Sequence, residues 1–235
     1  MADQPAHLRL FPLQALVLYP GMPLPLNVFE SRYLQLIQEC TNAQEPFGVI
    51  LLKEGAEVGP NSIEPHLIGT TAHIQHVSSM GDERLSVSSV GGDRFRVRSF
   101  DHDHPYLAAD VEYLDDRSAG LVEPSLIGHV TDDATAFVRA IMARRGNFVH
   151  DVELPSGATD LSFHVAQIFQ GNPGIQQRLL ERDTFDRLWD ELNLIKTAMD
   201  QLISQGIDCA RLNFSHGTLD EHAEVIDNIR RLSKK

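Results

Sequence analysis

The spacing of apolar residues changes near residue 120, and this change limits the chain to folds with a β-rich part followed by a helical part. Before it, short runs of alternating apolar residues lie between Gly, Pro and Asp clusters, which is typical of strands. After it, apolar residues recur at steps of three and four, which is typical of packed helices. We therefore expect an α+β fold, with a mainly antiparallel β-barrel over residues 1–118 and a helical bundle over residues 119–235.

Six strands and one interrupting helix are predicted in the first part. The helix is expected at Glu30–Cys40, and a hairpin turn is expected at Gly91–Asp93. Strict alternation in Arg94–Arg98 places Phe95 in the barrel core and the three arginines outside it. The predicted strands are His7–Leu13, Phe47–Lys53, His66–His76, Arg84–Val90, Arg94–Phe100 and Tyr106–Leu114.

The second part carries several helical stripes separated by breakers. One helix should stop near Gly146, a second near Gly171, and the longest should run over Thr184–Gln205. A capping box at Thr218–Glu221 predicts a last helix. The breakers come too often for a long coiled coil, so we interpret the stripes as the core of a bundle.

The charge and composition of the chain limit the kinds of molecule that it is expected to bind. Acidic residues outnumber basic ones 33 to 20, for a net charge of -13. Such a chain repels the phosphates of nucleic acids, so nucleic-acid binding is not expected. It has no apolar run long enough for a membrane span and no secretory signal, and Cys40 and Cys209 are interpreted as thiols. We expect a cytoplasmic protein with no membrane partner.

No motif for catalysis or for a cofactor is found. The sequence lacks a P-loop, a Gly-x-Ser-x-Gly elbow and a His-Glu-x-x-His helix. The pair His102 and His104 lacks a recognisable distant ligand, so Asp101–His104 is interpreted as a solvated loop. We expect no catalytic residue, no metal and no cofactor.

Four prolines between Phe11 and Pro25 make this segment unusual. Proline fixes φ and removes a hydrogen-bond donor, so the segment should be a stiff, extended apolar loop and not an inner strand. Two interpretations remain: a loop packed across the end of the barrel, or a preorganised surface for an extended peptide. For Phe29 and Tyr33 a core position is the alternative. The candidate contacts for a peptide or protein are Leu18, Tyr19, Met22, Leu24, Leu26, Phe29 and Tyr33.

The same segment carries a family resemblance. It reads Phe-Pro-Leu at 11–13, Leu-Tyr-Pro-Gly-Met at 18–22 and Leu-Pro-Leu-Asn-Val-Phe-Glu-Ser-Arg-Tyr at 24–33. This pattern resembles the N-terminal substrate-binding domain of the Lon protease family. Further matching segments extend the resemblance over roughly residues 8 to 203, with a departure in the hairpin at Gly81–Arg84. They are Phe47–Val49, Ile68–Thr70, Gly92–Val97, Pro105–Leu107, Gln177–Glu181 and Arg187–Leu188.

The resemblance implies a PUA-like barrel followed by a helical bundle, and a role in capturing protein. In full-length relatives this domain passes unfolded or tagged protein to an ATPase ring and a Ser–Lys peptidase. Neither is expected in this chain. The resemblance therefore implies a non-catalytic module that binds unfolded or specific client proteins, alone or with a separate ATP-dependent protease. An RNA-binding PUA-like domain and an unrecognised hydrolase around His102 and His104 are the alternatives.

Structural roles are expected for other shared residues. Gly21 and Gly69 should permit positive φ or a close backbone approach, and Pro20 belongs to the stiff segment. Glu30, Arg32 and Arg94 are expected to form a charge-assisted pairing that holds the proline segment against the helix, with ligand contact as the alternative.

Overall fold

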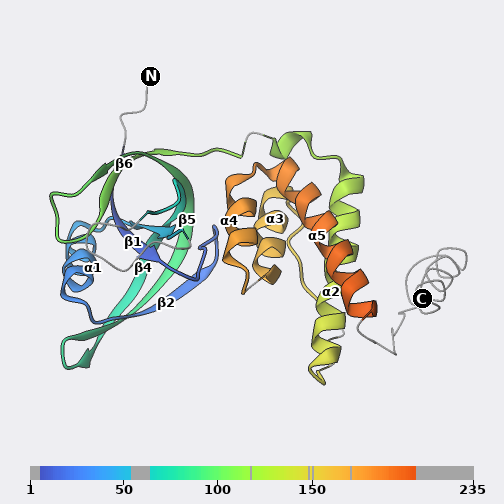
Figure 1. Cartoon of the computed structure of the whole chain (residues 1–235), viewed down its shortest axis with the longest axis horizontal. Coiled ribbons are helices and arrows are strands. Elements are labelled where there is room, and N and C mark those ends of the chain that lie inside the picture. Colours follow the sequence, from blue (N-terminus) through green and yellow to red (C-terminus); the bar gives the residue numbers. More distant parts are fainter. Residues whose placement is uncertain are drawn as a thin grey trace, which may run out of the picture.

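The computed structural model describes residues 6–53, 64–116, 118–147, 149, 151–169 and 171–204. A β-rich part with helix α1 lies beside a part made of helices (Figure 1). The helix predicted from the capping box at Thr218 and the second cysteine, Cys209, lie outside the described residues. The strands are β1 (Ala6–Leu13), β2 (Pro23–Val28), β3 (Phe47–Leu51), β4 (Ile68–Gly81), β5 (Arg84–Asp101) and β6 (Ala108–Tyr113). The helices are α1 (Ser31–Ala43), η1 (Ala119–Leu121), α2 (Pro124–Arg144), α3 (Ala158–Ala166), η2 (Gln167–Phe169), α4 (Pro173–Glu181) and α5 (Thr184–Ser204).

The strands form one sheet that closes on itself. Its order is β2-β5-β4-β3-β1-β6, and an additional pairing of β5 with β6 closes strands β5, β4, β3, β1 and β6 into a ring, with β2 paired to β5 at the edge. All pairings are antiparallel except that of β1 with β3. Closure leaves fewer free strand edges than an open sheet would have. The predicted α+β class with a mainly antiparallel barrel is confirmed.

Strand β5 corrects one prediction. The expected hairpin turn at Gly91–Asp93 is wrong, because the two strands predicted on either side of it form one strand of 18 residues. A Cβ on Gly91 would lie 2.0 Å from the backbone oxygen of Tyr19. The glycine therefore permits a second chain segment to cross close to β5, and it marks a close approach instead of a turn.

The proline segment is partly strand. The expectation of a loop through Pro25 is wrong, because Pro23 and Pro25 lie in β2, which pairs with β5 and ends the sheet order. Both prolines are exposed, and they alternate with the buried Leu24. An edge strand accepts proline because one row of its N–H groups has no partner in the sheet.

The barrel core is built around an aromatic ring and glycines. Phe95 is fully buried, and a Cβ on Gly69 would lie 2.3 Å from the Val49 oxygen and 2.7 Å from the Phe95 ring. Only a residue without a side chain permits this approach, as expected for Gly69. Gly21 has a φ of 74°, in the left-handed region that glycine favours, as expected for a turn between β1 and β2.

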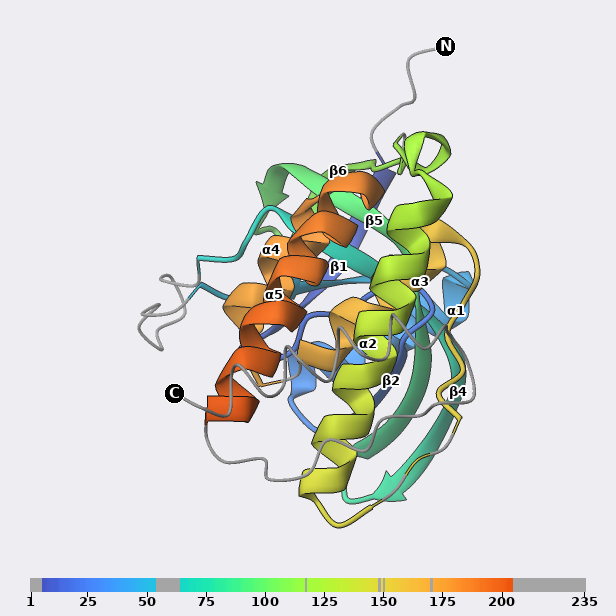
Figure 2. The same ribbon diagram turned by 90° about the vertical axis from the view of Figure 1, so that its right-hand side faces the viewer.

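The helical part lies against one side of the barrel. Helices α3 and α4 lie next to the strands, and α2 and α5 lie in front of them when the molecule is viewed from the helical side (Figure 2). The apolar stripes predicted for these helices form a shared core that includes Val130, Phe137, Leu188 and Leu192. Within the described part of the chain, no helix combines the length and apolar character that crossing a bilayer requires.

Candidate functional site

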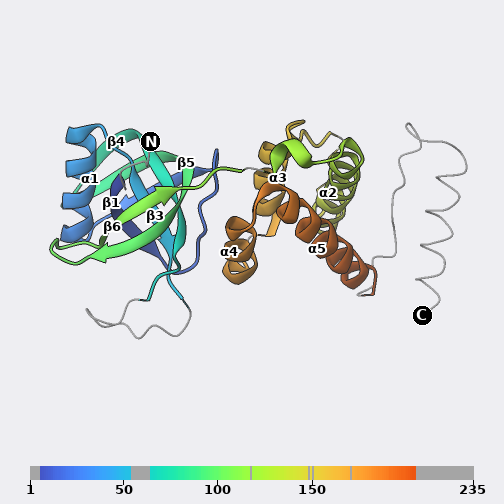
Figure 3. The ribbon, with the colours of Figure 1, turned by 90° about the horizontal axis from the view of Figure 1, so that it is seen from above.

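An open groove lies between α1 and the β4–β5 hairpin. It has a volume of about 440 Å³, within the roughly 300–1,000 Å³ typical of binding pockets. Helix α1, one wall of the groove, lies on the side of the barrel away from helices α2–α5 (Figure 3). All of the lining residues belong to α1 or to the β4–β5 hairpin, so the helical part does not contribute to the groove. Its lining residues are Leu34, Ile37, Gln38, Thr41, Asn42, Val77, Ser79, Glu83, Arg84 and Leu85.

Secondary structure explains why these residues meet. Leu34, Gln38 and Thr41 are spaced by four and three residues, so they share one face of α1. Val77 and Ser79 alternate along β4 and therefore share a face of the sheet, and Ser79 pairs directly with Leu85. A helical stripe thus faces a strand stripe across the groove.

The groove has an apolar floor and a polar rim. Leu34, Val77 and Leu85 are partly buried and pack against the barrel's largest core cluster. Gln38, Asn42 and Arg84 are exposed around them. An apolar floor with a few polar groups at its edge is the usual composition of a binding site, since the floor supplies affinity and the rim supplies orientation.

The hairpin that forms one wall ends in a tight turn. Gly81 pairs with Arg84, so Asp82 and Glu83 form a two-residue loop, with φ of 46° and 55°. Positive φ at both positions defines the turn type that matches the twist of a hairpin. The departure from the family pattern at this turn therefore keeps the hairpin geometry without a glycine at either central position.

One predicted contact residue, Phe29, is exposed just before α1. Its side chain is 67% exposed, although a core position was the alternative expectation. Phe29 follows Val28, whose partner across the sheet is the groove residue Leu85, and it precedes the first turn of α1. Phe29 is thus an exposed aromatic side chain close in sequence to α1 and to the strand partner of Leu85, and it is a candidate contact at this end of α1.

Most of the other predicted contacts are not on the surface. Leu18, Leu24 and Tyr33 are buried in the core cluster that α1 shares with the barrel, where Tyr33 stacks on Phe11 with a centroid distance of 4.3 Å. The interpretation as a surface for a peptide is wrong for Leu18 and Leu24, which pack inward as the alternative of a packed segment expects, and Tyr33 has the core position given as its alternative. Met22 and Leu26 are only partly buried and pack against the same cluster.

Tyr19 is also buried, for a different reason. It lies between the barrel and the helices, in a cluster with Phe163 and Leu179. Its hydroxyl donates a hydrogen bond to the Gln176 carbonyl oxygen at 2.8 Å. Burial raises the pKa of this hydroxyl well above its ordinary value. Tyr19 therefore joins the two parts of the protein and is not available to a partner.

The expected pairing of Arg94 with Glu30 and Arg32 is wrong. Arg32 and Glu30 pair with each other at 2.7 Å, on the exposed surface at the start of α1. Arg94 is buried outside the barrel, because the helical part covers that face. It donates from Nη1 to the carbonyl oxygens of Leu180 and Arg182, at 2.7 and 2.8 Å.

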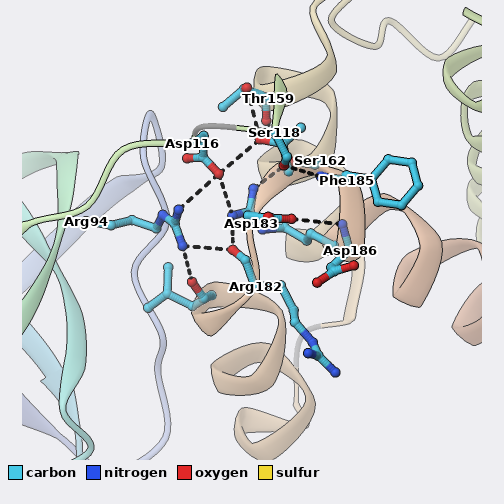
Figure 4. A network of polar contacts seen from close by, with 12 residues as sticks. Arg94, Asp116, Ser118, Thr159, Ser162, Arg182, Asp183, Phe185 and Asp186 are labelled. Atoms are coloured by element: carbon cyan, nitrogen blue, oxygen red, sulfur yellow. Dashed lines mark hydrogen bonds and ion pairs between the residues drawn. The ribbon is translucent and has the colours of Figure 1, made fainter. Parts of the chain in front are cut away.

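Asp116 connects Arg94 to a second buried arginine. One of its carboxylate oxygens lies 3.0 Å from Arg94 Nη2 (Figure 4). The same oxygen lies 3.1 Å from Arg187 Nη2. The same oxygen accepts a hydrogen bond from Thr184 at 2.9 Å. Charge-assisted bonds of this kind are short and directional, so the network fixes the end of the barrel to the start of α5.

Arg187 is the least exposed large side chain of the network. Its guanidinium lies 3.9 Å from the centre of the Phe163 ring and donates to Ser162 Oγ at 2.7 Å. Burial, followed by the nearby charge of Arg94, lowers the pKa of Arg187 to about 10. The role of this cluster is structural, since most of its donors bond to protein atoms, with Arg94 Nε the donor that lacks a partner among the described residues.

Glu191 lies one helical turn beyond Arg187 and is fully buried. Neither of its carboxylate oxygens has a hydrogen-bond partner among the described residues. Burial raises the pKa of this carboxyl well above its ordinary value, against the opposing effect of Arg187.

The three alternating arginines of β5 all have hydrogen-bond or ion-pair partners within the protein. Arg94 is buried, while Arg96 and Arg98 both pair with Glu112. The strict alternation predicted three arginines outside the barrel, but only two of them face solvent. The two exposed arginines therefore share one acidic partner, Glu112.

The groove was not predicted from the sequence. Its two walls are separated by more than 30 residues, and single residues such as Gln38 and Ser79 carry no motif. A signal for the buried arginine was present, since Thr184, Arg187 and Glu191 recur at helical spacing beside the apolar stripe of α5.

The fold and the groove together define a class of protein. The chain is a PUA-like β-barrel with attached helices and an open apolar surface groove. The chain belongs to the family described as the ATP-dependent protease La (LON) substrate-binding domain, whose family model matches residues 7–197. This confirms the resemblance found in the sequence.

Relatives and solved structures agree with this assignment. A Lon protease from Anaeromyxobacter dehalogenans is 28% identical over 194 residues, covering 76% of this chain and 22% of the relative. Lon protease 2 from Myxococcus xanthus is 30% identical over 160 residues, covering 68% and 18%. The matched part thus spans about a fifth of the length of these relatives.

Two solved structures share the fold. A Lon N-terminal domain protein from Xanthomonas campestris has a TM-score of 0.61 and 26% identity, covering 80% of this chain and 98% of that one. The N-terminal domain of a Mycobacterium avium complex Lon protease has a TM-score of 0.59 and 12% identity, covering 81% and 98%. The second likeness supports the fold alone.

Proposed function

We propose that this protein binds unfolded or otherwise exposed polypeptide segments in the groove between α1 and the β4–β5 hairpin. The observation that carries the proposal is an open apolar floor that the helical part leaves uncovered. The family's description as a substrate-binding domain of a protease supports polypeptide as the ligand. Folded proteins bury their apolar side chains, so such a groove selects chains that have lost or not reached their fold.

The shape of the groove suits a few apolar side chains on a short segment. Leu34, Val77 and Leu85 offer contact surface, and we propose the exposed Phe29 as an additional contact. Aromatic and aliphatic anchors in such positions supply most of the binding energy of an interface. The rim groups Gln38 and Asn42 are placed to bond to the peptide backbone, which is common to all clients.

The proposed role is non-catalytic. Any cleavage of a captured client would be performed by a separate ATP-dependent protease, the kind of enzyme to which the family's domain belongs. We further propose a cytoplasmic location, which the free thiol of Cys40 supports because reducing compartments preserve thiols.

The test is a pair of groove substitutions with a matched control. Leu34→Ser removes an apolar side chain that lines the groove, and Phe29→Ser removes the proposed additional contact, while Leu121→Ser removes a side chain that is 74% exposed on η1. Binding is measured by fluorescence anisotropy with labelled, reduced and carboxymethylated α-lactalbumin, which cannot refold. Circular dichroism confirms that each variant is folded.

The proposal expects each groove variant to weaken binding about fivefold, or roughly 1 kcal/mol, and Leu121→Ser to leave it unchanged. Equal affinity in all three variants would show that the groove is not the binding site. An equal loss in Leu121→Ser would show general stickiness instead of a site.

A further inference from the structure

A cluster of two histidines and an aspartate lies where the start of β1 meets the end of β5. His7 belongs to β1, Asp101 is the last residue of β5, and His104 lies in the connection to β6. Their ligand atoms all lie within 4.8 Å of one another. His7 Nε2 and His104 Nε2 are each 3.6 Å from the same Asp101 oxygen, Oδ2.

The sheet register creates this cluster. His7 pairs with Asp110 on one side of β6, and Ser99 pairs with Asp110 on the other. Residues Ser99 and Asp101 are two apart in β5, so both side chains are on the face that carries His7. The distant ligand that could not be recognised in the sequence is therefore supplied by a strand more than 90 residues away.

We propose that His7, Asp101 and His104 bind a divalent transition-metal ion, with zinc the ion that suits the ligands best. Imidazole nitrogens with one carboxylate favour zinc and its neighbours over magnesium or calcium, which prefer oxygen ligands. For Zn–N and Zn–O distances near 2.0–2.1 Å, tetrahedral ligands are about 3.3–3.4 Å apart. The two separations of 3.6 Å require only a small contraction of exposed side chains.

Neighbouring groups hold the ligands in a suitable orientation. The Asp110 carboxylate can only accept from His7 Nδ1, at 3.0 Å, so Nδ1 carries the proton and Nε2 presents its lone pair to the cluster. A carboxylate on the far nitrogen is the usual support for a metal-binding histidine. Asp101 accepts from the backbone N–H of Asp103 at 2.8 Å, and the His104 ring stacks on Tyr106 at an interplanar angle of 3°.

Three protein ligands leave a coordination position open to water or to a donor from another molecule. A bound ion would also tie the first strand of the barrel to the β5–β6 connection. Metal binding therefore raises the melting temperature in addition to occupying the site.

The experiment uses the full chain without a polyhistidine tag. Isothermal titration with Zn²⁺ gives stoichiometry and affinity, and visible absorption with Co²⁺ reports low-symmetry nitrogen and oxygen coordination. His7→Gln and His104→Gln each remove one ligand. His102→Gln is the matched control, because it lies in the same connection but outside the cluster.

We expect one Zn²⁺ per chain, at least tenfold weaker binding in His7→Gln and His104→Gln, and unchanged binding in His102→Gln. Binding equal in the wild type and both ligand variants, or an equal loss in His102→Gln, would overturn the site. A wild type that binds no Zn²⁺ would also overturn it. If a ligand variant fails to fold, amide NMR of the wild type with Co²⁺ provides the test instead. The proposed site requires the amide signals that broaden to centre on the start of β1 and residues 101–110.

Discussion

At the residue scale, a single carboxylate at the boundary between strands and helices serves two buried cations. Asp116 pairs with Arg94 and Arg187, which otherwise donate to carbonyl oxygens and to Ser162. The burial of both guanidiniums is tolerated because their donors are largely used. Removing the shared acceptor would leave two desolvated cations without their counter-charge.

We therefore predict that Asp116→Ala lowers the free energy of unfolding by about 3–5 kcal/mol. Asp115→Ala is the control, since Asp115 is the exposed neighbour and should change stability by less than about 0.5 kcal/mol. Urea denaturation of both variants checks this. Similar losses in the two variants would mean that the network does not stabilise the fold.

Glu191 predicts a dependence on pH. Its pKa in the folded protein is raised by burial, so the folded state holds the proton more tightly than the unfolded state. The contribution of this tightly held proton to the free energy of unfolding is complete below the ordinary pKa of about 4.5. It is lost as the pH rises from there through the raised pKa of the folded state. At neutral and higher pH, the Glu191 carboxyl of the folded protein must either stay protonated, which costs free energy at that pH, or become a buried charge.

Glu191→Gln should accordingly raise the free energy of unfolding at pH 8 by about 1–3 kcal/mol and have little effect at pH 4. Asp200→Asn, which neutralises an exposed carboxylate on the same helix, is the matched control. Stability curves at the two pH values provide the measurement. A gain that is independent of pH would contradict the explanation.

The sequence predicted residue positions better than residue environments. Phe95 was placed in the core by its alternation with arginines, and it is there. The same alternation placed Arg94 outside the barrel, which is correct, but this outside face is covered by helices. Tyr19 was misplaced for the same reason, because local pattern contains no information about which face a distant element covers.

At the element scale, β5 organises the barrel. It pairs with β2 and β4 along its first part and with β6 along its last part. Its continuity through Gly91 was missed because two adjacent glycines before an aspartate are a typical turn sequence. The requirement for glycine comes from Tyr19, which lies more than 70 residues away in the chain.

Gly91→Ala should therefore lower the free energy of unfolding by at least about 1–3 kcal/mol, because the new Cβ would meet the backbone oxygen of Tyr19 at 2.0 Å. Gly128→Ala provides the contrast, since that glycine lies inside α2 with nothing within 4 Å of the added atom. It should raise stability by about 0.5–1 kcal/mol. Thermal or urea denaturation measures both variants, and the explanation requires their changes in stability to have opposite signs.

Other elements followed from local pattern alone. The α1 helix and the long α5 helix agree with the predictions to within a few residues, because their apolar stripes are long and regular. The groove between α1 and the β4–β5 hairpin did not follow, since it depends on how two elements pack. Local sequence specifies each wall, and only the tertiary fold brings the walls together.

At the scale of the whole molecule, an apolar cluster and the arginine network join the barrel to the helices. Val17 and Tyr19 from one part pack with Phe163, Leu179 and Leu180 from the other. We propose residues 1–118 and 119–235 as two subdomains whose contact is this cluster. A buried contact of this kind couples the stability of its two sides.

The coupling predicts one calorimetric unfolding transition for the barrel and the helices together. The van't Hoff and calorimetric enthalpies should agree, and tryptophan fluorescence from Trp189 in α5 should change at the same temperature as near-ultraviolet circular dichroism from the barrel tyrosines. Two separate transitions would contradict the coupling. Asp116→Ala is the variant expected to separate them.

The central claim is that the groove on the far side of the barrel from the helices captures polypeptide, and hydrogen exchange with and without reduced, carboxymethylated α-lactalbumin tests it most directly. The account predicts slower exchange in α1 and in the β4–β5 hairpin, with no change in α2 and α5. Protection confined to the helical part, with α1 and the hairpin unchanged, would contradict it.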